Sequence, residues 1–274
     1  TFRNIYTSIK FSAIDKNIKT LAITSSIPAE GKSLFSSLLG LNASEIGKNI
    51  LLIDADLRKP SLHKKFKSDN VIGLSNILVD DNYSWRDALN TYEGSKNLFY
   101  ITGGKTPPNP VKLLESKKIK NLIKEISESN EFDLIIFDCP PILGLSDALI
   151  IGQNVDGLIL TISLNKVKRN LVKESIKKIN ITSTQIIGTV ANTVNLPLNN
   201  PKLNNNYYYN YGDGYSYGYG YGYGYLNKYL PKETNNAYAN NDEKSLKDNT
   251  DKNKNKLIKT FSKFKNMLMD WFNE

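Results

Sequence analysis

Cysteine and histidine are almost absent from this sequence of 274 residues, which contains one cysteine, Cys139, and one histidine, His63. A single cysteine excludes an internal disulfide and a metal site built from several thiolates. A single histidine leaves little room for catalysis by a serine–histidine or cysteine–histidine pair. Any catalysis must therefore use carboxylates, lysine and a bound metal ion.

Long apolar runs are also missing. No apolar run approaches the ~18 residues that a membrane-crossing helix needs. The first residues, TFRNIYTSIK, lack the basic and then apolar order of a signal peptide, and they lack an initiator methionine. We therefore expect a soluble piece of a longer protein.

The formal net charge is +9, and basic residues outnumber acidic ones both in residues 1–200 and in residues 201–274. A basic balance permits polyanionic partners such as ATP, membrane headgroups or nucleic acid. Because the excess is spread over the whole chain, it selects none of them.

Short apolar runs alternate with segments of helical periodicity from Lys19 to about Val194. Parallel strands are buried on both faces, so this alternation predicts an α/β fold with a mostly parallel central sheet and helices on both faces. The predicted strands are Leu21–Thr24, Ile50–Ile53, Leu98–Ile101, Leu134–Phe137, Gly157–Ile162 and Ile186–Val190. The predicted helices lie near residues 33–46, 116–129, 147–153 and 169–181.

The composition changes abruptly after Val194. Residues 207–225 read YYYNYGDGYSYGYGYGYGY, in which glycine at nearly every second position disfavours a helix or a packed core. Residues 256–272 regain helical spacing, with lysines beside an apolar face. Four regions are predicted: a domain over 1–195, a disordered tyrosine-rich tail over 196–230, a polar linker over 231–255 and an amphipathic helix over 256–274.

A phosphate-binding loop is indicated by residues 25–33, SSIPAEGKS, which follow the first predicted strand and precede a helix-period segment. Gly31 lets backbone N–H groups close around phosphate oxygens, and Lys32 reaches the terminal phosphates. The Ser33 hydroxyl can ligate Mg²⁺. Ser26 replaces the usual first glycine, so the motif deviates from its common form.

Carboxylates follow two further predicted strands. Asp54 and Asp56 end the run that begins at Ile50, and Asp138 ends the run that begins at Leu134. The carboxyl ends of parallel strands form the ligand-binding edge of an open α/β sheet. An acid that ends such a strand is also the Walker B arrangement, which holds Mg²⁺ or its water. These patterns predict a site for Mg²⁺ and ATP.

Residues 54–66, DADLRKPSLHKKF, resemble the Walker A′ segment of the bacterial tyrosine kinase (BY-kinase) family, whose members are cytoplasmic partners of chain-length regulators in capsule and exopolysaccharide export. The resemblance extends in order over about residues 1–195 and includes GLSNIL at 73–78, PPNPVKLL at 107–114, and DCPP at 138–141 followed by SDA at 146–148. It implies a P-loop fold of the MinD/ParA-like type and an ATP-dependent protein-tyrosine kinase activity.

The resemblance also implies roles for individual residues. Lys32 would contact phosphate, Asp54 would lie near the attacking hydroxyl, and Asp56 would assist the metal through water. The predicted catalytic residues are Lys32, Asp54, Asp56 and Arg58, and the predicted metal ligands are Ser33, Asp56 and Asp138. The predicted nucleotide-binding residues are Ser26, Pro28, Ala29, Glu30, Gly31, Lys32, Ser33 and Asn192.

Tyrosine phosphorylation fits this set of residues. A phenol has a pKa of about 10, so at neutral pH it needs a carboxylate that orients it and accepts its proton. The transfer otherwise requires positioning and positive charge at the terminal phosphate. Lys32, Mg²⁺ and Arg58 would supply that charge.

The tyrosine-rich tail follows the kinase-like domain and is therefore the predicted substrate. Residues 191–206, if extended at ~3.3 Å each, span about 50 Å and can reach the active site of a neighbouring copy. We expect autophosphorylation in trans within a ring-like homo-oligomer, which the accumulated phosphate charge would then drive apart. The alternative is an adhesive low-complexity tract without phosphorylation. The predicted phosphoacceptors are Tyr207, Tyr208, Tyr209, Tyr211, Tyr215, Tyr217, Tyr219, Tyr221, Tyr223 and Tyr225.

Partners and location are implied in the same way. A membrane chain-length regulator, or a transmembrane region preceding this sequence, would hold the kinase at the cytoplasmic face of the plasma membrane. A cognate tyrosine phosphatase would reverse the reaction, and no nucleic acid is implied. TFRNIY at residues 1–6 resembles the oligomerisation helix of the family, although Tyr6 stands where the second arginine is expected. Residues 256–272 can lie on an anionic membrane surface or dock on protein.

Two other functions remain open. A switch of the MinD/ParA kind would transfer phosphate to water, but such proteins usually carry a second lysine early in the loop, where this chain has Ser25, Ser26 and Ile27. The other is a nucleotide-binding scaffold that does not turn over ATP. His63 is interpreted as a packing or surface residue, and Cys139 as a packing residue beside the Walker B acid.

Overall fold

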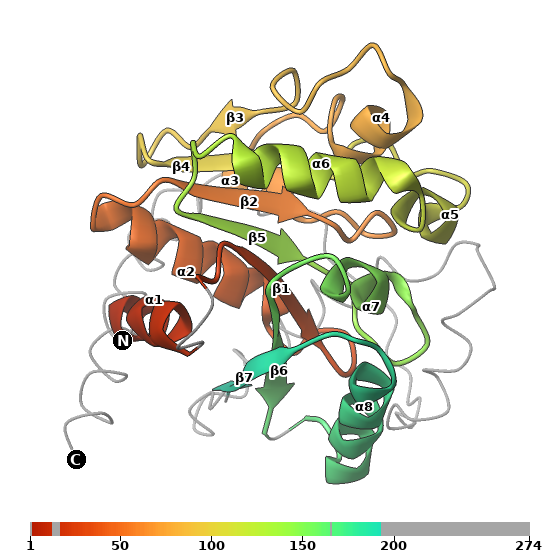
Figure 1. The fold of residues 1–274 in the computed structure, drawn as a ribbon. Helices are drawn as coiled ribbons and strands as arrows, with labels where there is room; N and C mark the ends of the chain where they lie inside the picture. Colours follow the sequence, from red (N-terminus) through yellow and green to blue (C-terminus); the bar gives the residue numbers. More distant parts are fainter. Residues whose placement is uncertain (1, 13–16, 165, 193–274) are drawn as a thin grey trace, which may run out of the picture. The chain divides into compact units, whose positions relative to one another are not determined.

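The computed structural model describes residues 2–12, 17–164 and 166–192. These residues form seven strands: β1 (Thr20–Ser25), β2 (Ile50–Asp54), β3 (Asn90–Thr91), β4 (Leu98–Ile101), β5 (Leu134–Asp138), β6 (Gly157–Ser163) and β7 (Ile186–Asn192). The strands make one sheet in the order β3-β4-β2-β5-β1-β6-β7 (Figure 1). All neighbouring pairs are parallel except β3 and β4, so the predicted α/β fold is confirmed.

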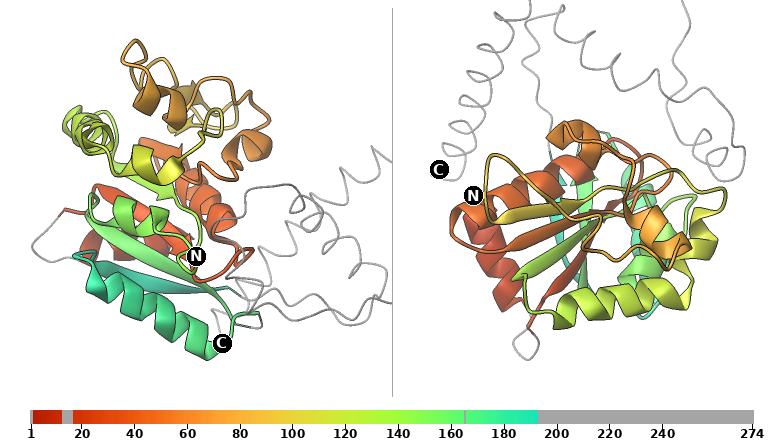
Figure 2. Two further views of the ribbon diagram at one scale, coloured as in Figure 1. Left: turned by 90° about the vertical axis from the view of Figure 1, so that its right-hand side faces the viewer. Right: turned by 90° about the horizontal axis from the view of Figure 1, so that it is seen from above.

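Helices cover both faces of this sheet, as the turned views show (Figure 2). The helices are α1 (Phe2–Phe11), α2 (Lys32–Glu45), α3 (Leu62–Phe66), α4 (Leu74–Val79), α5 (Pro110–Leu114), α6 (Lys117–Glu128), α7 (Asp147–Gly152) and α8 (Arg169–Ile181). Apolar residues of α1, α2 and α3 pack in the core on one face, and those of α4 to α8 pack in the core on the other.

Alternating residues of each central strand supply the two cores. In β1, Leu21 and Ile23 pack with α1 and α2, whereas Ala22 packs in the core that contains α6. All three are fully buried. Side chains of a strand point alternately to its two faces, so a strand covered on both sides must be apolar at every position.

All six predicted strands and all four predicted helices are present, within two residues of the expected bounds. The pattern did not predict β3, α4 or α5, which are only 2, 6 and 5 residues long. Segments this short carry too few apolar positions to show a period.

No helix of the described residues is long and apolar enough to cross a membrane. The predicted tail, linker and terminal helix, together with the ten candidate phosphoacceptor tyrosines, lie outside the described residues. The predicted domain boundaries therefore stay predictions.

The core under α2 gives a stability prediction. Leu39 is fully buried among residues of α2 and β1, whereas Leu34 of the same helix is 43% exposed. Leu39→Ala should lower the free energy of unfolding by about 2–5 kcal/mol, because it removes buried methyl groups and leaves a cavity. Leu34→Ala should change it by less than about 1 kcal/mol. Urea unfolding measures both, and equal losses would contradict this account of the core.

Candidate active site

The candidate site lies at the carboxyl edge of the sheet, where β1, β2 and β5 end side by side. Asp138 is in register with Ile23 of β1 on one side and with Asp54 of β2 on the other. The loop from Ser26 to Gly31 joins β1 to α2 at the same edge. The topology therefore brings together three segments that are distant in the sequence.

The loop has the backbone conformation of a phosphate-binding turn. Gly31 has φ 88° and Ala29 has φ 61°, both in the left-handed region. The φ of Gly31 strains any L side chain, and a Cβ there would lie 2.2 Å from Nδ2 of Asn192, which would have to move. The chain enters α2 directly after this turn, and the backbone N–H of Phe35 donates to the Gly31 carbonyl at 2.8 Å. The open N–H groups at this helix start form an anion-binding feature.

Glu30 fixes the loop from inside the domain. Its buried carboxylate accepts hydrogen bonds from the backbone N–H groups of Ile27 at 2.8 Å and Ser163 at 2.9 Å. Burial raises its pKa above the ordinary value, although these hydrogen bonds oppose the shift. Asn192 Nδ2 donates to the Glu30 carbonyl at 3.1 Å. The predicted nucleotide-binding residues Glu30 and Asn192 thus both lie in or against the loop.

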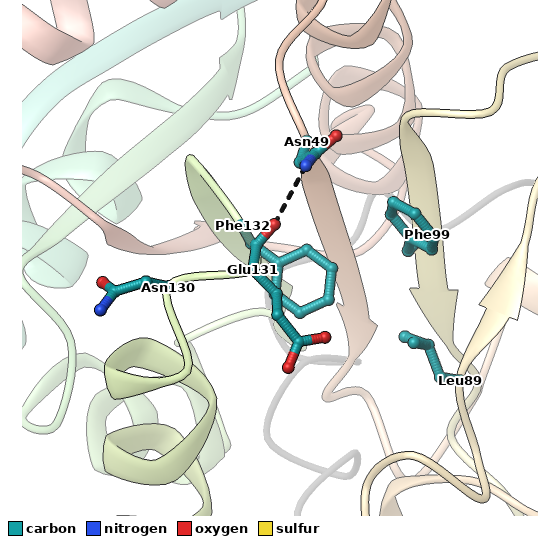
Figure 3. A pocket seen from close by; sticks show the side chains of 6 residues that line it. All are labelled: Asn49, Leu89, Phe99, Asn130, Glu131 and Phe132. Atoms are coloured by element: carbon teal, nitrogen blue, oxygen red, sulfur yellow. Dashed lines mark hydrogen bonds between the residues drawn. The ribbon is translucent and has the colours of Figure 1, made fainter.

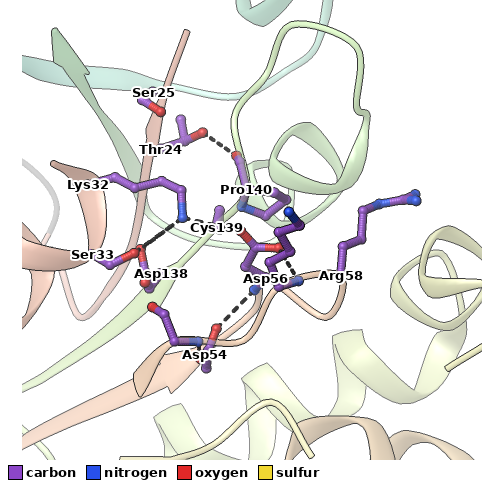
Figure 4. Close-up of polar contacts among 12 residues, drawn as sticks. Thr24, Ser25, Lys32, Ser33, Asp54, Asp56, Arg58, Asp138, Cys139 and Pro140 are labelled. Carbon is purple, nitrogen blue, oxygen red and sulfur yellow. Dashed lines mark hydrogen bonds and ion pairs between the residues drawn. The ribbon is translucent and has the colours of Figure 1, made fainter. Parts of the chain in front are cut away.

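Lys32 lies among the acids of the site (Figure 4). Its Nζ is 3.3 Å from Oδ2 of Asp56, 3.7 Å from Oδ1 of Asp138 and 3.3 Å from Oγ of Ser33. Burial alone would lower the pKa of Lys32, but the charges of Asp138, Asp56 and Asp54 outweigh it and raise the pKa. Lys32 is therefore held as a cation.

The Asp138 carboxylate is fully buried, and neither of its oxygens has a partner in ordinary hydrogen-bonding geometry among the described residues. Burial raises its pKa, against the lowering effect of Lys32. A buried acid without hydrogen bonds is costly unless a ligand completes it. Among the described residues, no three His, Cys, Asp or Glu side chains are arranged so that they alone could hold a metal ion. One or two carboxylates with a hydroxyl and substrate phosphates suit Mg²⁺, so Asp138, Ser33 and Asp56 fit this ion.

Asp54 organises the segment that follows β2. Its Oδ2 accepts the backbone N–H groups of Ser61 at 2.7 Å and Leu62 at 2.9 Å, and its Oδ1 accepts that of Asp56 at 3.3 Å. Burial, followed by the charge of Asp138, raises its pKa to about 8. The residue therefore combines a structural role with an unusually basic carboxylate.

Arg58 extends away from Lys32 (Figure 4). Its guanidinium forms two hydrogen bonds with the carboxylate of Asp147, at 3.0 and 3.3 Å. The structure thus brings Lys32, Asp54, Asp56 and Asp138 together and places the charged end of Arg58 in a separate pair.

Other polar groups lie in or near the loop. The buried hydroxyls of Ser26 and Thr161 have no partner among the described residues. Cys139 is buried, donates to the Phe137 carbonyl, and has a pKa raised well above the ordinary value by burial. Sequence reasoning missed Ser163 and Asp147. Ser163 contributes through its backbone N–H, so its residue type gives no signal. Asp147 did have a signal, because it lies in the family-like SDA stretch at residues 146–148.

A separate pocket of about 320 Å³ lies at the opposite, amino edge of the sheet (Figure 3). Asn49 precedes β2 there, and its side chain donates to the carbonyl of Glu131 at 3.2 Å. The pocket holds none of the predicted site residues. Its lining is Asn49, Leu89, Phe99, Asn130, Glu131 and Phe132.

Together the turn, the lysine among the acids and the acidic strand ends define a P-loop nucleotide-binding protein of the deviant-Walker class. The chain is 37% identical over 191 residues to the tyrosine-protein kinase YwqD of Bacillus subtilis, which covers 70% of this chain and 79% of that relative. It is 34% identical over 198 residues to the putative tyrosine-protein kinase CapB of Staphylococcus aureus, which covers 72% of this chain and 85% of CapB. No protein-family model matches the chain.

Solved structures of similar fold support the same class of protein. The crystal structure of the chimerical protein CapA2B2 has a TM-score of 0.65 and 28% identity, over 70% of this chain and 82% of that one. The Mg-ADP complex of the septum site-determining protein MinD from Pyrococcus horikoshii has a TM-score of 0.53 over 62% of this chain and 68% of that one; at 21% identity it shows the fold alone. The chain belongs to the bacterial tyrosine-protein kinase (BY-kinase) family of capsule and exopolysaccharide synthesis.

The raised pKa of Asp54 predicts a pH dependence of stability in the absence of nucleotide. Its folded pKa of about 8 lies above the ordinary 3.8, so the folded state binds the extra proton between these values. The contribution of Asp54 to the free energy of unfolding therefore falls as pH rises from about 4 to 8 and is constant above that range. Asp54→Asn removes it.

Urea unfolding of both proteins at several pH values between 5 and 8 measures the difference. The wild type should lose at least about 1 kcal/mol relative to Asp54→Asn across this range. Asparagine also disturbs the hydrogen bonds of Asp54, which changes stability by the same amount at every pH. The test is therefore the slope of the stability difference against pH. A difference that stays constant with pH contradicts the assignment.

Proposed function

We propose that this kinase transfers the γ-phosphate of ATP to tyrosines in the C-terminal cluster of another copy, and that this reaction regulates the polymerisation and export of a capsular polysaccharide or exopolysaccharide. The observation that carries the proposal is the convergence of Lys32, Asp54, Asp56 and Asp138 at one edge of the sheet. In addition, neither oxygen of Asp138 accepts a hydrogen bond in ordinary geometry among the described residues, and its closest cation, Lys32 Nζ, is 3.7 Å away.

The triphosphate of ATP would be held by the loop and by Lys32. N–H groups at the start of α2 can donate to phosphate oxygens, and the Lys32 ammonium already lies among groups that a phosphate and a metal ion would contact. Ser33, Asp56 and Asp138 would hold Mg²⁺, which would offset negative charge at the phosphates. The remaining requirement is an acceptor for the phenolic proton.

Asp54 is the proposed acceptor of that proton. A carboxylate can orient the phenolic hydroxyl and accept its proton, and burial makes the Asp54 carboxylate more basic than an ordinary one by raising its pKa. A carboxylate offers about four acceptor positions, and three backbone N–H groups occupy three of them. One position therefore remains for the hydroxyl of a tyrosine.

A membrane chain-length regulator is the proposed partner, at the cytoplasmic face of the plasma membrane, with a ring-like homo-oligomer as the active assembly and a phosphatase as the opposing enzyme. The family to which the chain belongs supports this assignment. Similarity to the chimerical protein CapA2B2 is consistent with a kinase that works together with a second polypeptide. For residues 256–272 both alternatives stay open, contact with the membrane surface and docking on protein.

Phosphosite mass spectrometry after incubation with Mg·ATP tests the proposal. The wild type should gain phosphate on tyrosines between 207 and 225, and Lys32→Met should gain none, because it loses the cation of the phosphate loop. Lys124→Met is the matched control, since Lys124 is 72% exposed on α6. It should behave as the wild type. Free phosphate without phosphotyrosine would instead favour an ATPase switch.

A mixing experiment tests transfer between copies. Lys32→Met serves as acceptor, and an otherwise wild-type chain with all ten tail tyrosines changed to phenylalanine serves as donor. Phosphate should appear on the tail of the Lys32→Met chain only when both are present. An acceptor that stays unmodified, with a donor that still binds ATP, contradicts transfer in trans.

A further inference from the structure

Arg58 and Asp147 form a pair that joins the two acid-bearing parts of the site. Arg58 belongs to the segment after β2 that carries Asp54 and Asp56. Asp147 is the first residue of α7, the helix that follows β5 and the Walker B acid Asp138. The pair spans 89 residues of sequence and consists of Nε to Oδ2 at 3.0 Å and Nη2 to Oδ1 at 3.3 Å.

The two partners differ in burial. The Asp147 side chain is fully buried, whereas that of Arg58 is 21% exposed. A buried carboxylate is strongly unfavourable without a cation, and two parallel hydrogen bonds fix both the distance and the orientation of a guanidinium. Because Arg58 is the cation that the structure pairs with Asp147, moving it onto a phosphate would leave Asp147 buried and uncompensated.

The segment between Asp54 and Arg58 alternates in its contacts. Ala55 and Leu57 are fully buried in the core that also contains Ala148 of α7. Asp54 and Asp56 face the site. Hydrogen bonds fix the first part of the segment, since the Ala55 N–H donates to the Asp138 carbonyl at 3.0 Å and the Asp54 carboxylate accepts three backbone N–H groups. At its other end, the Arg58–Asp147 pair ties the segment to α7.

We infer that Arg58 and Asp147 are positioning residues that set the orientation of Asp54 and Asp56 toward the phosphates and the tyrosine hydroxyl. Arg58 then contributes to the reaction through Asp147, and not as a positive charge on phosphate. Asp147 gains a functional role that the sequence did not assign to it. This inference rests on the tyrosine-kinase activity, and a failure of that activity would be visible in the wild type itself.

The test is a double-mutant cycle with Arg58→Ala, Asp147→Asn and the double variant. We expect each single variant to lower kcat for tail phosphorylation by at least about tenfold, because small misplacements of catalytic groups are costly. The double variant should be no slower than the slower single variant, since residues that act as one unit are not additive. The Kd of a fluorescent ATP analogue should change by less than threefold, because the phosphate loop and Lys32 remain.

Arg58→Lys keeps the charge but not the two-pronged geometry. A positioning role predicts a loss in kcat close to that of Arg58→Ala. If Arg58 contacts phosphate directly, Arg58→Lys should retain most of the activity and Asp147→Asn should be nearly as active as the wild type. Either result overturns the inference.

Glu131→Gln is the matched control, because Glu131 pairs with Arg86 at the opposite edge of the sheet and its side chain is 44% exposed. It should leave kcat unchanged. The stoichiometry of analogue binding counts the folded fraction of each variant, so a variant that folds poorly is compared per folded molecule. A loss that disappears after this correction also overturns the inference.

Discussion

One lysine, with 12% of its side chain exposed, lies among three buried carboxylates at the carboxyl edge of the sheet, and the chemistry of the domain follows from that imbalance of charge. If Asp54, Asp56 and Asp138 were all ionised, Lys32 would cancel only part of their charge. Burial and the neighbouring acids raise the pKa values of Asp54 and Asp138. A bound metal ion would offset the negative charge of the three carboxylates, and a triphosphate would give Lys32 a new partner. The site is therefore built to be completed by a ligand.

The apolar strands hold the acids close together despite their repulsion. The central strands are buried along their whole lengths, so their ends are held in fixed register. Asp54 and Asp138 are opposite each other because β2 and β5 are neighbours in that register. The Glu30 carboxylate and the Asn192 side chain hold the phosphate loop against β6 and β7 in the same way. The stability of the sheet thus offsets the repulsion between the like charges that it places side by side.

Most of the fold could be predicted because its elements carry strong patterns. Strands such as Leu134–Asp138 are apolar at nearly every position, and helices such as α6 show a clear period. The edge strand β3 has only two residues, and its pairing with β4 comes from tertiary contacts that no local pattern records. The convergence of Asp54 and Asp138 followed from a general rule about parallel sheets.

The placement of Arg58 could not be predicted in the same way. A basic residue after two acids suggests a group that contacts phosphate, and its actual partner, Asp147, lies 89 residues further along the chain. The double role of Asp54 was also hidden, because its hydrogen bonds go to backbone N–H groups of Ser61 and Leu62. Backbone donors have no residue type, so sequence alone does not reveal them.

Calorimetric titration of a non-hydrolysable ATP analogue, with and without Mg²⁺, tests the central claim most directly. In the wild type, Mg²⁺ should strengthen binding markedly, because Asp138 is a buried acid whose oxygens accept no hydrogen bond in ordinary geometry among the described residues. In Asp138→Asn this enhancement should fall by at least about tenfold, whereas the exposed-site variant Lys124→Met should keep it. An Asp138→Asn protein that retains the full effect of Mg²⁺ would contradict the account.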